Sequence, residues 1–524
     1  MAAYPELSNA PDFDTSAIRW DVEANVERLW HADPTVWYDD RVVPELADRL
    51  GWLHLHETMR PRLDELTALG RAAKDEAVVD VVVCGMGGSS LAPETFSEVF
   101  GSQPGYPTVE ILDSTHPDAV RSITEKIDAE SSWFVISSKS GTTLETLSFM
   151  RHFWEMTGGN GSRFIAVTDP GTPLVDLGEE RGFRQVVLAP PDVGGRYSAL
   201  TPFGLVPAAL MGIDLNKLLD SAAELADTSG RRAADDPLVG LGLAWGAQGR
   251  RGTDKLTLRT SPGLSAFPAW MEQLVAESLG KDGLGIVPVA NEPDLEVYGQ
   301  DRMFVGYRLG DEELDMPVGY PGTVLTLSSP YDLAGEMLRA EVATAVAGEV
   351  MGIHPFNQPD VELAKELARE FMERGPEEVA TEKVTLGTQE ASEQLIRILD
   401  RLKPGDYLAV QAYLAPSPEI DGVVAEFRRI VGEKYGVATT FGYGPRFLHS
   451  TGQLHKGGRN NGVFLQLVDF PSDDLPVPET DTTFGQIIGA QAAGDLEALQ
   501  KRDRRVLALG VDAGDLTPLI GVTK

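Results

Sequence analysis

The stretch SSKSGTTLET, residues 137–146, carries the side chains best suited to binding a phosphate. Lys139 and a set of hydroxyl residues surround Gly141, the hydroxyl residues being Ser138, Ser140, Thr142, Thr143 and Thr146. Thr142 and Glu145 have the spacing of a capping box, which predicts that a helix begins in this loop. Hydroxyl groups, free N–H groups and the helix dipole would then converge, an arrangement that can bind a phosphate monoester without a metal. The alternative is a serine-rich helix cap with no ligand.

A glycine-rich turn precedes this stretch in CGMGGSSLAPETF, residues 84–96. Gly87 and Gly88 would let the backbone approach a ligand closely, and Ser89 would follow at the start of a helix. The turn lacks the lysine of a P-loop and fits the dinucleotide-binding fingerprint poorly. A glycine turn needed only for helix–strand packing is an equally good interpretation, and Cys84 is most simply a core residue.

Two further stretches offer an arginine and a carboxylate. Arg196 follows two glycines in GGRYSALTPFG, residues 194–204, where its planar guanidinium could stabilise an oxyanion or simply pair with a surface carboxylate. The stretch SAFPAWMEQLVAESLGKDG, residues 265–283, has an apolar helical face, and Gln273 and Glu277 share another face four residues apart. Glu277 could act as a general base, although a solvated helix face explains an isolated glutamate equally simply.

The last two stretches contain lysine and histidine. In FNQPDVELAK, residues 356–365, Pro359 suits the first turn of a helix, and Lys365 lies off the apolar stripe as a surface lysine would. FLHSTGQLHKGGRNNG, residues 447–462, places His449, His455, Lys456 and Arg459 among glycines. It could be a solvated basic loop, a phosphate cradle, or half of an active site whose other half lies far earlier.

Apolar strand-like runs must position these side chains. Runs at residues 78–85, 108–113, 133–138, 163–169 and 184–190 are separated by enough chain for crossover helices, which predicts an α/β, doubly wound, mostly parallel sheet. A second set lies at 254–260, 285–290, 302–309, 323–328, 406–414, 437–443 and 462–468. We therefore expect two α/β sandwiches: a first at 61–230 and a second at 231–524, with residues 1–60 as a helical segment packed on the first. Ligands of such sheets lie beyond the carboxyl ends of the strands, which is where the first three stretches fall.

Taken together, CGMGGSSLAPETF, SSKSGTTLET, GGRYSALTPFG, QLVAESLGKDG, FNQPDVELAK and HSTGQ resemble the motifs of phosphoglucose isomerases, over nearly the whole chain. The family fold is a pair of sugar isomerase (SIS-type) sandwiches, and the sequence is most similar to the isomerase half of transaldolase–phosphoglucose isomerase fusions. The resemblance implies an aldose–ketose isomerase of glycolysis and gluconeogenesis. It would interconvert glucose 6-phosphate and fructose 6-phosphate by ring opening and proton transfer through a cis-enediol, with neither metal nor redox cofactor.

The same resemblance implies a role for individual residues. The 6-phosphate would be held by Ser138, Lys139, Ser140, Thr142 and Thr143, with Gly88 and Ser89 beside the sugar. Glu277 would be the base, Gln273 would bind substrate, and Arg196 would stabilise the enediolate. His449 and Lys365 would assist ring opening. The family also implies a homodimer in which the His449 loop is shared across the interface.

The sequence departs from the common family pattern in three places. The block containing Lys365 precedes the block containing His449, so the segments of the second sandwich are expected to be reordered. Leu279 and Asn357 stand where polar and aspartate residues are usual, and both could alter the fit of the sugar. His455, Lys456 and Arg459 have no family role, and we expect them to form a basic rim.

Charge and composition limit the other possibilities. The net charge of −35 argues against nucleic acid or an anionic membrane as a partner, so an anionic substrate needs a local basic pocket. One cysteine excludes an internal disulfide, and the N-terminal residues lack the pattern of a signal peptide, so we expect a cytoplasmic protein. An isomerase for another sugar, such as mannose 6-phosphate, and a non-catalytic sugar-phosphate-binding SIS regulator remain alternatives.

Overall fold

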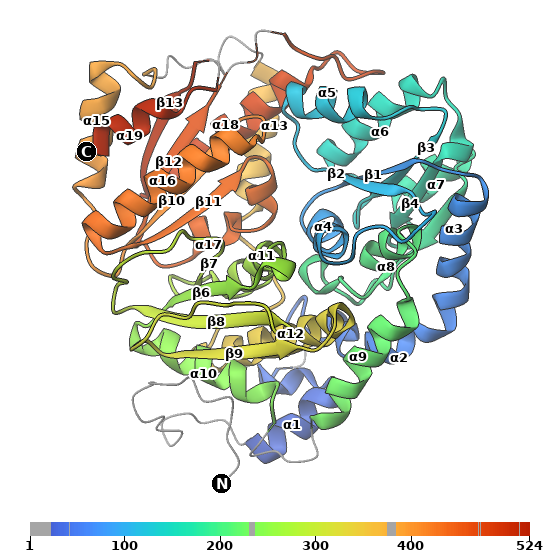
Figure 1. Cartoon of the computed structure of the whole chain (residues 1–524), viewed down its shortest axis with the longest axis horizontal. Helices are drawn as coiled ribbons and strands as arrows, with labels where there is room; N and C mark the ends of the chain where they lie inside the picture. The colour runs from blue at the N-terminus through green and yellow to red at the C-terminus, as the bar shows by residue number, and fades with distance from the viewer. Residues whose placement is uncertain are drawn as a thin grey trace.

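The computed structural model describes residues 22–40, 42–229, 236–374, 384–469, 471, 473–512 and 514–523. These residues form three sheets, all of whose strands run parallel. Figure 1 shows the first sheet on the right of the molecule and the other two on the left, one above the other. The prediction of an α/β fold built on parallel sheets is confirmed.

The first sheet has five strands in the order β2-β1-β3-β4-β5. Their bounds are β1 Asp80–Gly85, β2 Thr108–Leu112, β3 Ser132–Ser137, β4 Phe164–Thr168 and β5 Gln185–Leu188. Alternate residues of β1 enter different apolar clusters: Val81 and Val83 pack on one face, Val82 and Cys84 on the other. The sheet is therefore buried on both faces, as near-continuous apolar strands predict.

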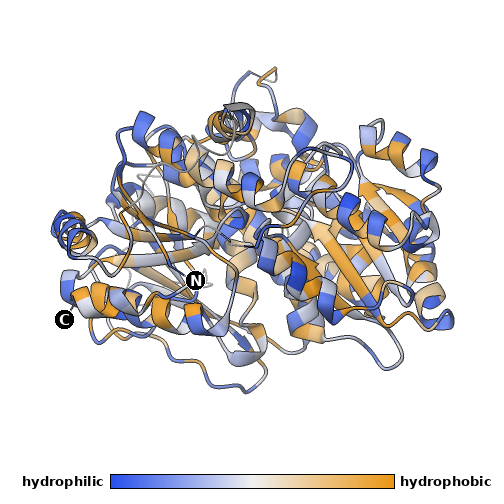
Figure 2. Ribbon diagram, turned by 90° about the horizontal axis from the view of Figure 1, so that it is seen from above, coloured by the Kyte–Doolittle hydropathy of each residue, from blue (hydrophilic) through white to orange (hydrophobic). Residues whose placement is uncertain are grey.

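Helices cover both faces of this sheet, and their outer surfaces are the more hydrophilic ones in Figure 2. The helices of this part of the chain are α3 Leu63–Asp75, α4 Gly88–Phe100, α5 Pro117–Lys126, α6 Leu144–Met156, α7 Pro173–Glu180, α8 Pro202–Leu210 and α9 Leu215–Thr228. Helices α4 and α6 begin directly after β1 and β3, so their N-termini lie at the carboxyl edge of the sheet. This edge carries two of the candidate stretches.

The strands after residue 231 form two four-stranded sheets, where we expected one sandwich. One has the order β7-β6-β8-β9, with β6 Lys255–Thr260, β7 Val287–Val289, β8 Arg302–Leu309 and β9 Gly322–Leu327. The other has the order β11-β10-β12-β13, with β10 Tyr407–Tyr413, β11 Ala438–Tyr443, β12 Gly462–Val468 and β13 Arg505–Gly510. Of these strands, β13 was missed in the sequence, because RVLALG is short and follows a charged run.

The helices of this second part are α10 Val239–Arg251, α11 Phe267–Leu279, α12 Leu333–Met351, α13 Glu362–Arg374, α15 Gln389–Leu399, α16 Pro418–Tyr435, α17 Gly452–Gly457, α18 Phe484–Lys501 and α19 Thr517–Thr523. Helix α11 lies near the centre of the molecule, where the three sheets approach one another (Figure 1). It contacts α4 of the first part and α12, α17 and β7 of the second. Groups on α11 can therefore meet residues from distant parts of the chain.

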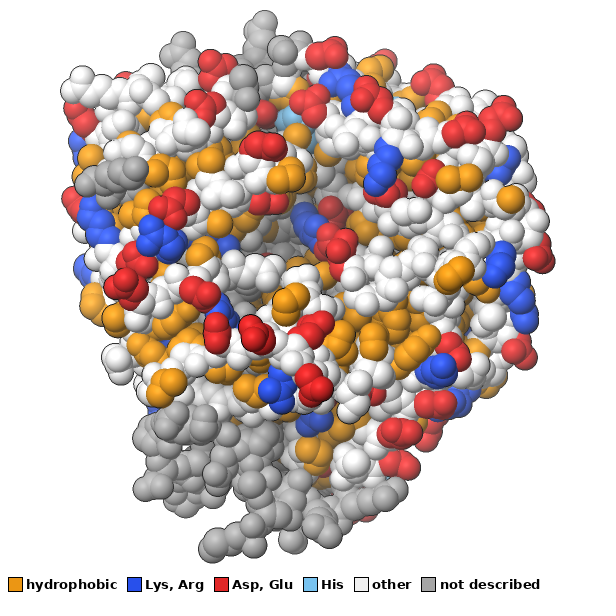
Figure 3. Space-filling view, viewed as in Figure 1, with side chains coloured by type: hydrophobic (Ala, Val, Ile, Leu, Met, Phe, Trp, Pro, Cys, Tyr) orange, Lys and Arg blue, Asp and Glu red, His pale blue; other side chains and the backbone are white. Residues whose placement is uncertain are grey.

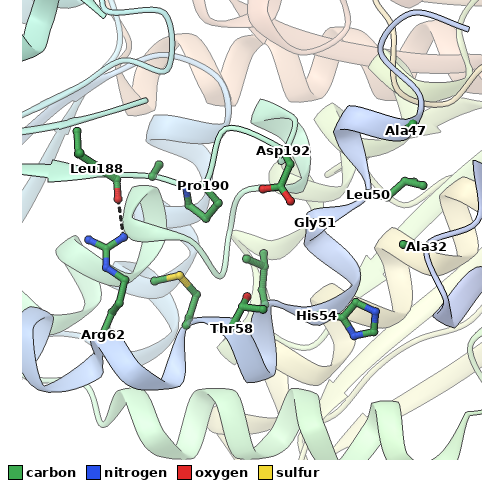
Figure 4. Close-up of a pocket in the computed structure, with 13 residues that line it drawn as sticks. Ala32, Ala47, Leu50, Gly51, His54, Thr58, Arg62, Leu188, Pro190 and Asp192 are labelled. Carbon is green, nitrogen blue, oxygen red and sulfur yellow. Dashed lines mark hydrogen bonds between the residues drawn. The ribbon is translucent and has the colours of Figure 1, made fainter. Parts of the chain in front are cut away.

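The N-terminal residues that are described form short helices: α1 Val22–Trp30, α2 Leu55–Thr58, and the 3-10 turns η4 Gly51–His54 and η5 Arg60–Arg62. Residues of α2, η4 and η5 line a cavity of about 530 Å³ beside the chain that follows β5. Figure 4 shows Arg62 donating a hydrogen bond to the carbonyl of Leu188 (2.5 Å) across this cavity. The N–H of Gly51 donates to the carbonyl of Asp192 at 3.1 Å. The segment thus braces the loop that leads from β5 to Arg196.

In the described part of the chain, no helix is both long enough and apolar enough to cross a membrane.

Candidate functional site

The carboxylate of Glu277 contacts the side chains of Arg196 and Gln273. Nη1 of Arg196, from the 3-10 turn η7 (Gly195–Tyr197), is 3.5 Å from Glu277 Oε1. Gln273, one turn earlier on α11, donates its Nε2 to Glu277 Oε2 at 3.3 Å and to the backbone carbonyl of His449 at 2.9 Å. The structure therefore brings four residues predicted from three separate stretches into one contact network, and Glu277 is only 8 % exposed.

The guanidinium of Arg196 is held by a full set of acceptors. Its Nε donates to Ser278 Oγ (2.8 Å), Nη1 to Gln358 Oε1 (3.1 Å), and Nη2 to the carbonyls of Pro355 and Asn357 (2.8 and 3.0 Å). These bonds fix the plane of the group without neutralising its charge, because all four acceptors are uncharged. Glu277 is its only carboxylate partner among the ion pairs of the described residues. The fixed positive charge can therefore stabilise an anion that forms beside Glu277.

Glycines of the turn after β1 permit the close approach of these elements. A Cβ atom on Gly88 would lie 2.0 Å from the carbonyl oxygen of Gly195, so α4 packs directly on the turn that carries the arginine. Gly87 has φ of +58°, and a Cβ atom there would lie 2.8 Å from Gln273 Nε2. Both glycines thus serve packing around the site, which supports the packing interpretation of this turn. Contact of Gly88 and Ser89 with a sugar stays a prediction.

The predicted capping box in the serine-rich stretch is wrong. Helix α6 begins at Leu144 with Thr143 as its N-cap, and no side chain caps it. Glu145 instead turns to remote partners: its Oε1 is 2.9 Å from His449 Nε2 and accepts a bond from Gln491 Nε2 at 2.7 Å. A carboxylate can only accept, so Nε2 of His449 is the donor and Nδ1 is left as the basic nitrogen of the neutral ring.

His449 reaches the site of its own chain. The 3-10 turn η11 (Arg446–His449) carries it to Glu145 and Gln273 of the same molecule. The expectation that this loop is shared across a homodimer interface stays a prediction. Arg446, at the start of the turn, pairs with Glu94 of α4 and with Asp113 after β2 (Nε to Oδ2, 3.2 Å), which ties the turn to the first part of the chain.

The hydroxyl groups of the predicted phosphate loop form two pairs. Ser138 Oγ is 2.9 Å from Thr143 Oγ1, and Ser140 Oγ is 3.0 Å from Thr142 Oγ1. Gly141, with φ of +68°, turns the loop between them. The loop leads into α6, whose first-turn N–H groups have no partner within the helix. Hydroxyls and helix N-terminus converge as predicted, and their binding of phosphate stays a prediction.

Lys139 differs from the rest of this loop. Its ammonium pairs with Asp169, which follows β4, and lies 3.4 Å from the carbonyl of Pro191. Burial raises the pKa of Asp169, and the bond from Lys139 opposes that rise. Lys139 therefore already has an acidic partner. To contact the phosphate as predicted, its ammonium must either leave Asp169 or bind Asp169 and the phosphate together.

A cavity of about 790 Å³ joins the phosphate loop to His449. It is lined by Ser140, Thr142 and Thr143 of the loop, by Glu145 and His449, by Lys456 and Gln491, and by residues of α13. A hollow with cationic and acidic side chains at its edges is visible in the middle of the space-filling view (Figure 3). The volume falls within the range of small-molecule sites, about 300–1,000 Å³.

The predicted basic rim is wrong for His455 and Lys456. Both residues are buried, 4 % and 2 % exposed as whole residues, and burial lowers the pKa of His455 well below its usual range. Lys456 faces the cavity, and its Nζ is 2.5 Å from Asp495 Oδ1. Arg459 lies away from it, 3.3 Å from Asp254 Oδ2.

The block that precedes Lys365 joins the site through backbone and amide groups. Gln453 of α17 accepts from the N–H of Asp360 (2.9 Å) and donates to that residue's carboxylate (2.8 Å) and to the carbonyl of Gly280 (3.1 Å). Three of the resembling stretches thus meet at one side chain, in spite of their altered order. Lys365 belongs to α13, but its side chain lies outside the described residues.

The two departures at Leu279 and Asn357 have structural explanations. Leu279 is fully buried in the main apolar core. Asn357 Oδ1 lies 3.1 Å from Nζ of Lys281, which also donates to the carbonyls of His354 and Asn357. Burial lowers the pKa of Lys281 well below its usual range. An aspartate at position 357 would offer this lysine a counter-ion, which the amide of Asn357 does not.

Within the described residues, no three His, Cys, Asp or Glu side chains are close enough to hold a metal ion. Sequence reasoning missed Gln491 and gave Glu145 a merely local role. The signal available for Gln491 was a polar residue inside the apolar run IIGAQAAG, and Glu145 carried no signal beyond its capping position.

Comparison with known proteins assigns the first half of the chain to a family. A family model described as phosphoglucose isomerase matches residues 52–286. Glucose-6-phosphate isomerase of Rubrobacter xylanophilus is 29 % identical over 395 residues, 63 % of this chain and 90 % of the relative. The enzyme of the same name from Symbiobacterium thermophilum is 31 % identical over 388 residues, 60 % of this chain and 85 % of the relative.

Solved structures agree in fold. A hypothetical protein from Thermus thermophilus superposes with a TM-score of 0.60 at 25 % identity, over 70 % of this chain and 99 % of that protein. A glucose-6-phosphate isomerase from Chlamydia trachomatis gives a TM-score of 0.52 at 20 % identity, over 72 % and 81 %. Taken with the relatives of similar sequence, these matches show that the chain belongs to the phosphoglucose isomerase family.

Proposed function

We propose that this protein interconverts glucose 6-phosphate and fructose 6-phosphate, as the names of its relatives and its site together support. The observation that carries the proposal is the continuous set of contacts from Arg196 through Glu277 and Gln273 to His449. Of this set, His449 lines the cavity that also takes in the hydroxyl-rich N-terminus of α6, so the carboxylate and the fixed cation connect to that cavity through Gln273 and His449. A role in glycolysis and gluconeogenesis follows from the reaction.

The reaction begins with binding and ring opening. Thr142, Thr143 and the neighbouring serines, with the N-terminus of α6, hold the 6-phosphate and so orient the sugar carbons. His449, whose Nε2–H is fixed by Glu145, takes up the proton of the O1 hydroxyl at Nδ1 as the ring opens. Lys365 is the proposed donor to the ring oxygen.

Isomerisation then needs a base and a stabilised anion. Glu277 removes the proton from C2 of the open aldose and returns it to C1, while the hydroxyl proton passes between O1 and O2. The charge that forms on the enediolate lies next to Arg196, whose geometry is already fixed by four uncharged acceptors. Proton transfers and a fixed cation account for the whole reaction, so no redox cofactor takes part.

A direct assay tests this proposal. The full-length protein receives fructose 6-phosphate in the presence of a chelator, and glucose 6-phosphate is followed with a coupled dehydrogenase. We expect turnover; its absence with correctly folded protein would refute the proposed function. Mannose 6-phosphate in the same assay decides the sugar, since faster turnover of that substrate would favour the alternative isomerase. Binding of both sugars without turnover would favour a regulator.

A homodimer that shares the His449 loop across its interface, as the family implies, is part of this proposal. The contacts of His449 with Glu145 and Gln273 within one chain offer the alternative of a site completed by a single subunit. Light scattering combined with activity measured across a hundredfold dilution separates the two. Specific activity that falls as the dimer dissociates would support the shared loop, and constant specific activity would support the single-subunit site.

A further inference from the structure

Lys456 is a buried cation that the proposed reaction leaves without a task. It sits on α17, seven residues after His449, and its side chain is 1 % exposed. Its counter-ion, Asp495 of α18, is fully buried. A buried pair costs desolvation energy that its own attraction barely offsets, and the further bond from Gln466 Nε2 to Asp495 Oδ2 is long, at 3.5 Å. Apolar residues of similar size would therefore stabilise the fold about as well. The pair therefore points to a role beyond stability.

Among the described residues, the donors of Lys456 exceed its acceptors. An ammonium group carries three N–H donors. Nζ forms an ion pair with Asp495 Oδ1 (2.5 Å), and one donor has the carbonyl of Gly452 at 3.4 Å, which is long for a hydrogen bond. The side chain also lines the cavity that contains His449 and the phosphate loop. A donor is thus available for an oxygen placed in that cavity.

Helix α18 sets the position of both this lysine and the histidine partner. Gln491 and Asp495 stand four residues apart, on the same face of the helix. Gln491 donates to Glu145, the residue bound to His449, while Asp495 binds Lys456. Thr115 donates to the other end of the Gln491 amide at 2.9 Å and so fixes its orientation. One face of α18 therefore contacts both Glu145 and Lys456, two residues that line the cavity.

We infer that Lys456 donates a hydrogen bond to an oxygen of the bound sugar phosphate, and that Asp495 is a positioning residue that holds the ammonium charged and aimed into the cavity. The inference rests on the proposed function for the identity of the ligand. Substrate and enediolate are both anionic, and a charged donor in a site shielded from water favours such a ligand. Lys456 would then supply the local positive charge that an anionic substrate needs in a protein with a net charge of −35.

The experiment uses a double substitution, Lys456→Met with Asp495→Leu, which removes both charges together and keeps the volume. Replacing a buried pair in this way is commonly neutral or stabilising, so the variant should fold. The matched control is Lys501→Met with Glu497→Leu, which removes an exposed ion pair of the same helix (2.8 Å) at no change in net charge. Melting curves by circular dichroism verify the fold of both.

Two probes distinguish a contact of Lys456 with the phosphate group from a contact with the sugar. Inorganic phosphate represents the phosphate group, and 6-phosphogluconate is an open-chain sugar acid whose carboxylate carries charge at C1, as the enediolate does. We expect calorimetry to show binding of 6-phosphogluconate weakened by about tenfold or more in the cavity variant and unchanged in the control. Equal weakening for inorganic phosphate would place the contact on the phosphate, and unchanged phosphate binding would place it on the sugar. Unchanged binding of both probes would overturn the inference.

Single variants keep the inference testable if the double variant unfolds. Lys456→Gln retains a donor toward Asp495 but removes the charge, and it should weaken 6-phosphogluconate similarly. Asp495→Asn removes the counter-ion of a buried positive charge, which the surrounding protein then disfavours. As the pH rises, this variant should lose binding of 6-phosphogluconate at a lower pH than the wild type does, and an unchanged pH profile would contradict the positioning role. Wild-type protein that neither binds the probes nor turns over substrate would instead refute the proposed function.

Discussion

The substitution Glu277→Gln isolates the proposed general base from the structure that surrounds it. The amide has the size of the carboxylate but cannot accept the proton that moves between C1 and C2. General bases contribute about 10²–10⁴-fold to turnover, which corresponds to roughly 2.7–5.5 kcal/mol in the activation barrier at 1.36 kcal/mol per tenfold. We therefore expect kcat for fructose 6-phosphate to fall by at least about a hundredfold.

The contacts around Glu277 indicate that Glu277→Gln lowers the stability of the fold only slightly. Arg196 keeps its four other acceptors, so its position does not depend on the charge of Glu277. The two oxygens of Glu277 face two donors, Arg196 Nη1 at 3.5 Å and Gln273 Nε2 at 3.3 Å. An amide can offer an oxygen to only one of them, so one contact is lost, at about 1–2 kcal/mol of stability. Binding of 6-phosphogluconate should stay within about tenfold of the wild type, the equivalent of 1.4 kcal/mol.

The control for this variant lies on the same helix. Glu272 has the same exposure as Glu277, 8 %, but lines a different cavity beside α4 and α16. Glu272→Gln should change kcat by less than about threefold, since the residue lies outside the proposed machinery. Activity is measured in the coupled dehydrogenase assay, and folding by thermal melting. Undiminished turnover in Glu277→Gln, or an equal loss in Glu272→Gln, would refute the assignment of the base.

Three further perturbations test the supports of the site. Gly88→Ala places a Cβ 2.0 Å from the carbonyl oxygen of Gly195, so it should displace the arginine turn and lower kcat at least about tenfold; full activity would show that the packing can relax. Arg446→Met removes the ion pairs at the start of the turn that carries His449, and kcat should fall while binding of inorganic phosphate is unchanged; loss of both would indicate general unfolding. Burial raises the pKa of Glu272 from 4.5 to about 8, so the folded state retains a proton that the unfolded state releases, and stability should decline as pH rises from 4.5 to 8. Urea unfolding should show this decline in the free energy of unfolding, which is of order 4–5 kcal/mol at 1.36 kcal/mol per pKa unit. The decline should be smaller in Glu272→Gln, and identical pH profiles of the two proteins would contradict the raised pKa.

The elements of the fold were largely predictable, because their signal is local. Runs such as residues 78–85 and 462–468 are apolar on both faces, and the strands β1 and β12 lie within them. Glycine and serine at the ends of β1 and β3 predicted the turns into α4 and α6. How the later strands divide between two sheets was not predictable, since each strand carries the same apolar pattern whichever neighbour it pairs with.

In the candidate site, local sequence signals predicted the residue types but not their contacts. The sequence by itself determined which residue types were available: a carboxylate on a helix near a glycine turn, an arginine between glycines, a hydroxyl-rich helix start and a histidine loop. Tertiary structure alone decided their partners, because His449 meets Glu145 across 304 positions of the chain, whereas the capping position of that glutamate suggested a neighbour three residues away. Burial of Lys456 likewise depends on α18, which supplies its counter-ion from 39 positions further along the sequence, and a lysine among glycines gives no sign of that helix. A spacing along the chain reports which face a side chain occupies, and only the packing of distant elements determines what that face meets.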